Sequence, residues 1–191
     1  MLELIRTERL VLRPLRPEDR AEYVRIEREG RDHFRPWVAT PPEGDTPERA
    51  FERELERSIT DRAAGTGERR AAELADGRIA GLFALSQIFR GAFLSAYAGW
   101  RVAADCTGRG LATEGVVALL DLAFAPEPLG LGLHRVQANV IPGNAASLRV
   151  AEKAGFRREG VALRYLKIDG RWQDHVMFAK TAEEHTLRYL G

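Results

Sequence analysis

Two glycines in a short loop, Gly108 and Gly110, mark the stretch of this sequence best suited to binding a charged ligand. The loop follows a strand-like run over 95–102 and precedes an apolar run of helical periodicity. Two glycines let the backbone turn sharply and leave its N–H groups uncovered by side chains. The following helix directs the positive end of its dipole at the same place. We therefore predict that the loop binds a phosphate or pyrophosphate, and thus a cofactor with a phosphate-rich end.

Two common nucleotide-binding motifs are excluded at this loop. No Gly-Lys-Ser/Thr follows it, as a Walker phosphate loop requires. Thr113 stands where the dinucleotide-binding motif needs its third glycine. An ordinary tight turn without a ligand remains the alternative explanation for the two glycines.

A second segment, from Asn144 to Gly155, has the residue types of a short helix that faces a ligand. Asn144 is a suitable N-cap and Gly155 a suitable C-terminal stop. Asn144 and Ser147 are three residues apart, so both side chains lie on one side of the helix start. The alternative is that Asn144 only caps the helix and Ser147 only occupies its first turn.

Together the two segments resemble the GNAT superfamily of acyl-CoA N-acyltransferases. Further stretches are similar to the ribosomal-protein-alanine N-acetyltransferases of the RimJ type, namely 7–13, 34–37, 89–93, 99–100, 139–160 and 165–176. The resemblance covers nearly the whole chain and is weakest over 38–75 and after Thr181. It implies direct transfer of an acetyl group from acetyl-CoA to a primary amine.

The resemblance also implies a role for each part of the site. The glycine loop is expected to hold the CoA pyrophosphate, and the end of the preceding strand to pair with the pantetheine amides. Asn144 is expected to contact the pantetheine, and Ser147 to donate a proton to the departing thiolate. The expected cofactor-binding residues are Trp100, Arg101, Val102, Thr107, Gly108, Arg109, Gly110, Leu111, Ala112, Thr113, Asn144 and Ser147.

The general base is not determined by the resemblance. Leu166 occupies the position of a glutamate that has been proposed as the base in some relatives, and leucine cannot accept a proton. Glu29, shortly before 34–37, is the catalytic candidate alongside Ser147; a surface carboxylate is its alternative role. A chain of water molecules could also carry the proton away, since an N-terminal amine has a pKa of about 8.

The acceptor is predicted to be a peptide N-terminus with a small first residue. Its groove is expected between 34–37, the turn at 89–93 and the segment 165–174. The candidate substrate-binding residues are Phe34, Trp37, Phe93, Tyr97 and Tyr165. Two other functions stay open, namely acetylation of a small amine (an antibiotic, a polyamine or an amino acid) and acyl-CoA binding without turnover.

Three other residue types, namely cysteine, histidine and glutamate, have simpler explanations. Cys106 lies beside the loop, but no catalytic partner is evident, so a covalent role is not expected. The four histidines lack metal-ligand spacing, so no metal site is predicted. His175 either shapes the acceptor pocket or is structural. Glu114 complements the helix dipole.

Bulk properties fit a small enzyme. The 191 residues carry a formal net charge of +1, which gives no reason to expect nucleic-acid or membrane binding. The single cysteine excludes an internal disulfide and suggests a reducing compartment. No signal peptide or membrane span is recognised, and the longest apolar runs are too short to cross a bilayer. A cytoplasmic monomer or homodimer is expected.

The elements that must position these residues form one domain over 1–191. Strands are expected at 10–12, 68–74, 79–88, 95–102 and 135–140, after Phe156, and at 172–179. Helices are expected at 17–30, from Thr46, at 110–125 and at 144–155, with Phe51, Leu55, Ile59 and Ala63 on the buried stripe of the second. This order predicts an α/β (α+β) mixed sheet with helices on both faces. The resemblance supplies the same architecture, the predominantly antiparallel twisted sheet of the GNAT fold.

Overall fold

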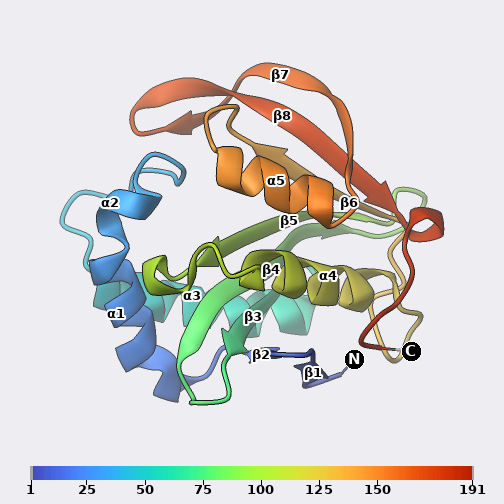
Figure 1. Cartoon of the computed structure of the whole chain (residues 1–191), viewed down its shortest axis with the longest axis horizontal. Helices are drawn as coiled ribbons and strands as arrows, with labels where there is room; N and C mark the ends of the chain where they lie inside the picture. The colour runs from blue at the N-terminus through green and yellow to red at the C-terminus, as the bar shows by residue number, and fades with distance from the viewer. Residues whose placement is uncertain (1, 191) are drawn as a thin grey trace.

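A single twisted sheet crosses the molecule in the computed structural model, which describes residues 2–190 (Figure 1). Its eight strands follow the order β1-β2-β3-β4-β5-β6-β8-β7. All neighbouring strands are antiparallel except β5 and β6, which are parallel. The strands are β1 (Ile5–Arg6), β2 (Val11–Pro14), β3 (Glu68–Glu73), β4 (Ile79–Phe89), β5 (Ser95–Val102), β6 (Arg135–Val140), β7 (Arg157–Ile168) and β8 (Arg171–Thr181). The predicted fold class is confirmed.

Helices cover both faces of this sheet. In Figure 1, α4 (Leu111–Phe124) and α5 (Ala145–Lys153) lie in front of it and α3 (Pro47–Ala64) lies behind it, beside α1 (Arg20–Glu29) and α2 (Arg31–Phe34). Alternation along the strands separates the two faces. Arg69 of β3 forms an ion pair with Asp61 of α3 on one face. Phe83 of β4 meets α4 on the other face, where a Cβ on Gly115 would lie 2.2 Å from its ring.

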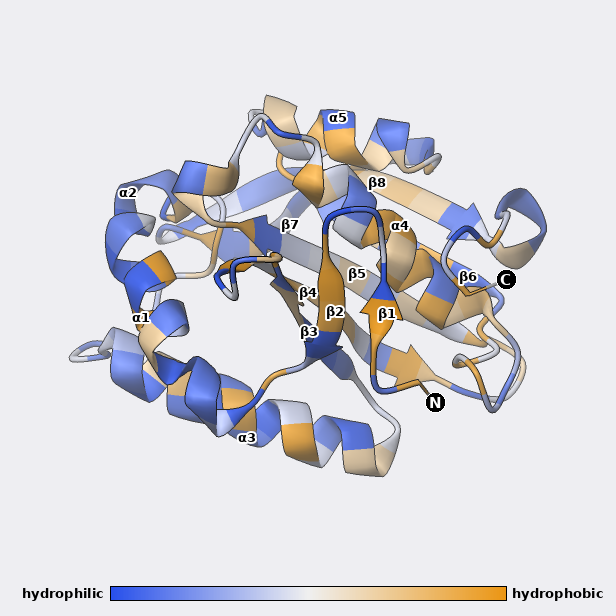
Figure 2. Cartoon of the chain, turned by 60° about the horizontal axis from the view of Figure 1, so that its bottom comes forward, coloured by the Kyte–Doolittle hydropathy of each residue, from blue (hydrophilic) through white to orange (hydrophobic). Residues whose placement is uncertain are grey.

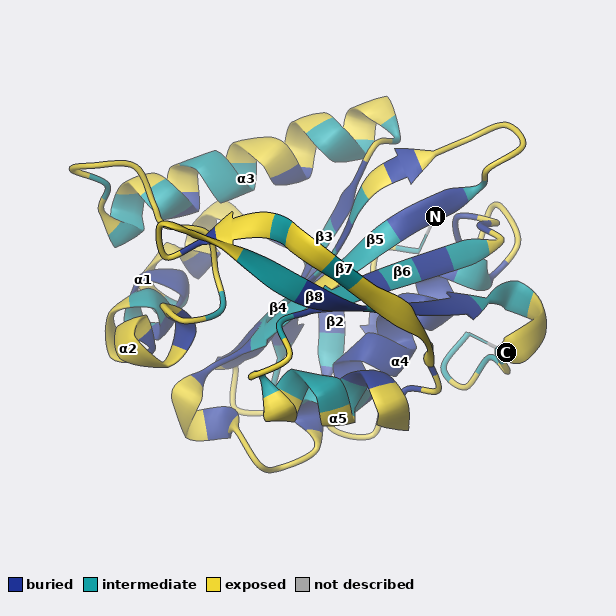
Figure 3. Ribbon diagram, turned by 90° about the horizontal axis from the view of Figure 1, so that it is seen from above, coloured by how far each residue is buried: buried dark blue, intermediate teal, exposed yellow. Residues whose placement is uncertain are grey.

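Helix α4 is the centre of the core. Ten consecutive residues, Glu114 to Ala123, are buried, as Figure 3 shows in dark blue. Burial therefore extends around the whole helix and is not confined to one stripe. The sheet covers one side, and the segment before β2 and the end of the chain cover the others, through bonds from Thr7 and Arg9 to Glu114 and from Tyr189 to Asp121. An apolar sequence of this kind fits a helix enclosed on all sides.

The predicted buried stripe of α3 is only partly correct. Phe51 is buried, but Ile59 is 61% exposed. The helix is mostly hydrophilic (Figure 2) and lies over a polar part of β3, where Arg69 pairs with Glu54 and Asp61. Ion pairing there takes the place of the apolar contacts that the periodicity suggested. The short strand β1 and the helix α2 were also not anticipated.

Strands β5 and β6 separate part-way along their length. They pair from Ser95↔Arg135 to Tyr97↔Gln137, and no pairing between them continues to Val102 and Val140. On its other side β5 stays paired with β4 as far as Val102. The backbone edge of β5 that faces β6 is thus free of strand partners over 98–102, which creates a V-shaped opening inside the sheet.

Candidate active site

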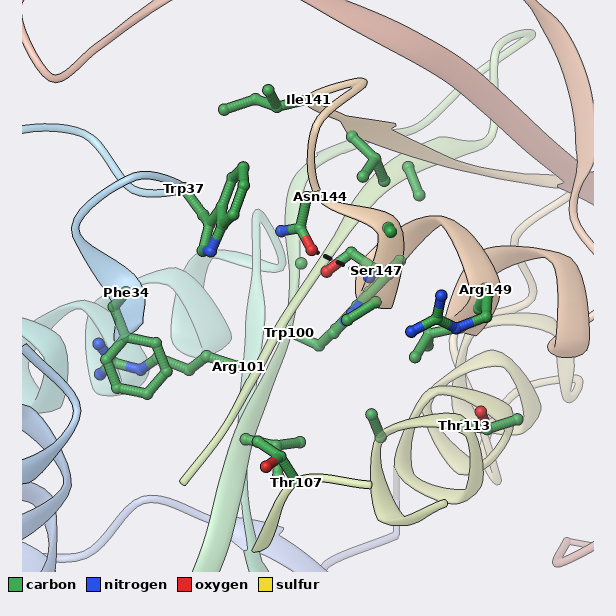
Figure 4. Close-up of a pocket in the computed structure, with 18 of the residues that line it drawn as sticks. Phe34, Trp37, Trp100, Arg101, Thr107, Thr113, Ile141, Asn144, Ser147 and Arg149 are labelled. Carbon is green, nitrogen blue, oxygen red and sulfur yellow. Dashed lines mark hydrogen bonds between the residues drawn. The ribbon is translucent and has the colours of Figure 1, made fainter. Parts of the chain in front are cut away.

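A cavity of about 850 Å³ lies at the opening between β5 and β6 (Figure 4). Its wall draws on segments far apart in the chain: the end of β5, the glycine loop with the start of α4, the end of β6 with the start of α5, and the stretch from α2 to Val38. Most of the predicted cofactor-binding residues line it. They are Trp100, Arg101, Val102, Thr107, Gly108, Gly110, Leu111, Ala112, Thr113, Asn144 and Ser147.

The glycine loop has the backbone geometry that its sequence predicts. Gly108 and Gly110 adopt left-handed conformations, with φ of 72° and 80°, which other residues adopt only with strain. Helix α4 begins directly afterwards, and its first N–H groups have no partners within the helix. These donors and the positive end of the dipole meet at the cavity wall, which suits a phosphate group. Arg109 does not line the cavity and is exposed.

A set of contacts made by Thr7, Arg9 and Glu114, called the bracket below, supports this loop. Glu114 is buried and accepts hydrogen bonds from the backbone N–H of Arg9 at 2.8 Å and from its Nε at 2.7 Å, as well as from the Thr7 hydroxyl. Arg9 Nη1 also donates to the Arg109 carbonyl at 2.8 Å. The C=O of Arg109 and the N–H of Gly110 belong to one planar peptide and point in opposite directions. By binding the Arg109 carbonyl, Arg9 therefore orients the Gly110 N–H away from the Arg9 guanidinium.

The hydrogen bonds of the bracket change the pKa of the Glu114 carboxyl. Burial by itself would raise the pKa of this carboxyl, but the hydrogen bonds from Thr7 and Arg9 outweigh burial and lower the pKa below its ordinary value of 4.5. The role predicted from sequence, complementing the helix dipole, is thus only part of what Glu114 does. The residues in the bracket are about 105 positions apart, so sequence spacing gave no sign of it.

Replacing Glu114 with Gln is expected to weaken acetyl-CoA binding by about tenfold and to lower the free energy of unfolding by about 1.5–3 kcal/mol, the usual range for hydrogen bonds to a charged group. Since the folded-state pKa is lowered, the stabilisation is present above pH 4.5 and is lost as the pH falls through the lowered value. Calorimetry and urea unfolding at several pH values measure both effects. Glu8→Gln, at an exposed neighbouring carboxylate, is the matched control; equal losses in both variants would contradict the bracket.

The start of α5 forms the opposite wall. The side-chain Oδ1 of Asn144 accepts a hydrogen bond from the Ser147 backbone N–H at 3.0 Å, which confirms the predicted N-cap (Figure 4). The Ser147 hydroxyl has no hydrogen-bond partner within residues 2–190, so it is free to bond with a ligand in the cavity. Trp37 faces this turn, with its ring 3.7 Å from the Cβ position of Gly143.

Arg101 contributes backbone rather than charge to the cavity. Its guanidinium turns toward α1, where it pairs with Glu27 and lies 4.8 Å from the ring centroid of Tyr23. The phenyl ring of Phe34 lies on the same guanidinium, 6.0 Å away (Figure 4). Because Glu27 balances the charge of this side chain, a ligand with amide groups would meet the free backbone edge of β5.

Of the predicted acceptor residues, Phe34 and Trp37 line the cavity. Tyr97 and Tyr165 do not, although Tyr165 accepts a hydrogen bond at 3.0 Å from Asn139 Nδ2 on the cavity wall. An ion pair of 3.7 Å between Arg35 and Asp169 joins the end of α2 to the β7–β8 turn. The ion pair therefore holds the turn beside α2, whose His33 and Phe34 line the cavity.

Phe93 does not belong with this group. It is 51% exposed, and its ring packs against Phe89, 5.6 Å away, in the turn between β4 and β5. This turn lies at the right-hand end of the sheet in Figure 1, whereas α2 and the β7–β8 turn lie at the left. The sequence predicted that 34–37, 89–93 and 165–174 border one groove. The 89–93 turn instead precedes β5, at the end of that strand opposite the glycine loop. We leave Phe93 out of the site.

Comparison with known proteins decides the family. The acetyltransferase (GNAT) domain model matches residues 9–157, more than half of the chain. This chain belongs to the GNAT acetyltransferase family. RimJ of Mycobacterium smegmatis, solved in complex with CoA-disulfide, is 34% identical to it, with a TM-score of 0.82 over 92% of this chain and 83% of that one. The predicted family is confirmed.

Two curated relatives resemble this chain over a shorter stretch. A probable N-acetyltransferase, YjcK of Bacillus subtilis, is 43% identical over 104 residues, and the [Ribosomal protein uS5]-alanine N-acetyltransferase of Escherichia coli is 34% identical over 108. The matches cover 54% and 56% of this chain and 55% and 54% of the relatives, about half of each.

The structure does not bring the predicted base of this GNAT enzyme to the cavity. Glu29 is exposed, pairs with Arg25 at 2.8 Å and is absent from the cavity wall. No other aspartate or glutamate among the described residues lines the cavity either. The wall instead carries His33, Arg149, Lys153 and His175. Of these, only His175 was predicted from the sequence to lie near the acceptor, since isolated basic residues on separate elements carry no motif.

Cys106 lines the cavity but is not an activated thiol. Burial, followed by the charge of Asp105, raises the pKa of its thiol, which favours the protonated form. A protonated thiol is a weak nucleophile. Within residues 2–190, no cluster of three or more metal-ligating side chains occurs. The same stretch contains no helix with the length and apolarity needed to span a membrane.

Proposed function

We propose that this chain transfers an acetyl group from acetyl-CoA directly to a primary amine, and that its acceptor is the α-amine of a protein N-terminus. One observation carries the proposal. A single cavity joins a left-handed glycine loop, the free backbone edge of β5 and the unbonded hydroxyl of Ser147. Along the cavity they would serve as a phosphate site, an edge that pairs with amides, and a proton donor.

The residues present fit acetyl-CoA along this line. The N–H groups of the glycine loop and the first turn of α4 would bind the pyrophosphate, with Arg149 and Lys153 of α5 supplying positive charge from the facing wall. The backbone of 98–102 would pair with the amides of the pantetheine arm. Asn144 and Ser147 lie near the end of that arm, where the thioester would be held.

The cofactor supplies an activated acetyl group, and the residues of the chain position it. Holding the thioester against β5 replaces a bimolecular encounter with an oriented one, which is a large part of the rate. The Ser147 hydroxyl would donate to the sulfur as it becomes a thiolate. Because that charge exists only late in the reaction, the interaction stabilises the transition state more than the bound substrate.

The composition of the cavity supports a peptide acceptor over a polyamine. Among the described lining residues there is no carboxylate to bind a polycation. The acceptor end is aromatic and apolar, with Phe34, Trp37 and Ile141 on its wall. The similarity to RimJ and to the uS5-alanine N-acetyltransferase points to the same class of acceptor.

A substrate panel tests the acceptor. Acetyl-CoA is incubated with peptides that begin with Ala or Ser, with intact ribosomal proteins and with small amines, and thiol release is measured. Efficient acetylation of the peptides or proteins is expected. Turnover of a small amine alone would refute the peptide acceptor while leaving the acetyltransferase standing, and the absence of turnover with every acceptor would favour a binding module.

Trp37→Ala is expected to raise the peptide KM about tenfold while leaving the Kd of acetyl-CoA nearly unchanged. A buried aromatic contact is worth a few kcal/mol in full, and Trp37 offers part of its ring to the acceptor end, away from the glycine loop. Steady-state kinetics and calorimetry measure the two quantities. Phe93→Ala is the control, since that ring lies outside the cavity. A similar KM increase in both variants would contradict the placement of the acceptor.

A further inference from the structure

His175, on β8, is a buried imidazole in the cavity wall that the steps above do not use. The residue is 3% exposed, yet it lines the cavity. Its Nδ1 lies 3.1 Å from the carbonyl oxygen of Gln173. A carbonyl oxygen only accepts hydrogen bonds, so Nδ1 must carry the hydrogen in the neutral ring. The lone pair is then on Nε2.

The Nε2 atom is available to a ligand. It has no hydrogen-bond partner within residues 2–190. It also keeps some accessible surface, unlike the sealed polar atoms of the core. The ring of Tyr165, 5.3 Å away between centroids, packs beside the imidazole and limits its rotation. A held ring with one open lone pair is what a proton acceptor requires.

A second unsatisfied acceptor lies close by. Asn139 donates from Nδ2 to the Tyr165 hydroxyl at 3.0 Å, and its Oδ1 is buried without a partner. Buried acceptors in folded proteins are nearly always paired, so an unpaired one marks a place where a donor is missing. An amine nitrogen carries several N–H donors, and the cavity wall offers it the open Nε2 of His175, beside Asn139, instead of a carboxylate.

Strand register places these groups opposite the proton donor. Tyr97 pairs with Gln137 and Asn139 with Met177, so the side chains of Tyr97, Asn139 and His175 share one face of the sheet. Arg101 shares this face and contacts Tyr23 of α1, which identifies it as the face of α1 and α3. Helix α5, which carries Ser147, covers the other face. The two sides meet only at the opening between β5 and β6.

We propose that His175 is the general base of this enzyme and that the acceptor amine binds beside its Nε2, next to Asn139. The amine nitrogen bonds to the acetyl carbonyl carbon while the carbon–sulfur bond breaks and its electron pair leaves with sulfur. The surplus proton on nitrogen passes to Nε2 of His175, and the imidazolium later releases it to solvent. Sulfur takes its proton from the Ser147 side, so acid and base act from opposite faces of the sheet.

The proposal rests on the proposed amine acetylation but not on the acceptor being a peptide. Its test therefore uses whichever amine the panel identifies. His175→Ala is expected to lower kcat by about 10²-fold, the scale of general-base catalysis, with the Kd of acetyl-CoA unchanged. Added imidazole should restore part of the lost rate, because the truncated side chain leaves room beside Asn139. His134→Ala, at an exposed histidine outside the cavity, is the matched control and should keep the wild-type kcat.

A measurement on the unaltered protein covers the case in which the variant does not fold. Nitrogen-15 NMR of histidine-labelled protein reports the tautomer of each neutral ring and needs no acceptor. His175 should show hydrogen on Nδ1 and a free Nε2. Hydrogen on Nε2, or a wild-type kcat in His175→Ala, would overturn the proposal. Inactivity with every amine in the panel would instead refute the proposed function.

Discussion

Acetyl-CoA affinity is expected to fall by about 10²-fold or more when Gly110 is replaced by Asp. A carboxylate would enter the site where the pyrophosphate meets the N-terminus of α4. The two negative groups would repel each other and compete for the same N–H donors and the same positive end of the helix dipole. Gly110 also has a φ of 80°, and its Cβ would lie 3.4 Å from Arg9 Nη2, so the new side chain would disturb the bracket. Calorimetry on the folded variant measures the loss.

Gly77→Asp is the matched control for this substitution. Gly77 lies in the β3–β4 turn with a φ of 84°, and nothing lies within 4 Å of its Cβ position. The two variants carry the same charge and the same left-handed strain, but only Gly110 lines the cavity. Unchanged acetyl-CoA affinity in folded Gly110→Asp would rule out the glycine loop as the cofactor anchor.

The second large effect is expected at Ser147, where replacement with Ala should lower kcat by about 10²-fold when chemistry limits the rate. The hydroxyl interacts with charge that develops on sulfur, so the Kd of acetyl-CoA should change little. The helix should remain intact, because Asn144 bonds to the backbone N–H of Ser147 and not to its hydroxyl. Single-turnover kinetics and calorimetry separate the two quantities.

Thr113→Ala provides the contrast for Ser147. Its side chain also belongs to the cavity wall, but at the start of α4 beside the phosphate loop. We expect this variant to weaken acetyl-CoA binding and to leave kcat unchanged, the reverse of the pattern for Ser147. A wild-type kcat in Ser147→Ala would reduce that residue to a structural member of the first turn of α5.

The sequence alone determined the parts of the site that form within a few neighbouring residues. Left-handed glycines at 108 and 110 and the helix that follows them depend on local backbone preferences, as does the Asn144 cap. Alternating and apolar runs located most of the strands and the buried helix α4. Local steric and hydrogen-bonding rules act over short spans, and the pattern therefore remains readable in the chain.

Only the tertiary structure decided what the distant segments do together. Arg9 and Glu114 have ordinary surface-type charges in the sequence, and folding joins them behind the loop in an ion pair whose carboxylate is buried. The separation of β5 from β6 decides where the cavity opens. His175 of β8 lies on the wall of this cavity, whereas Glu29 at the end of α1 is exposed, although sequence order favoured Glu29. Such contacts depend on strand register and packing across the whole sheet, which no local pattern encodes.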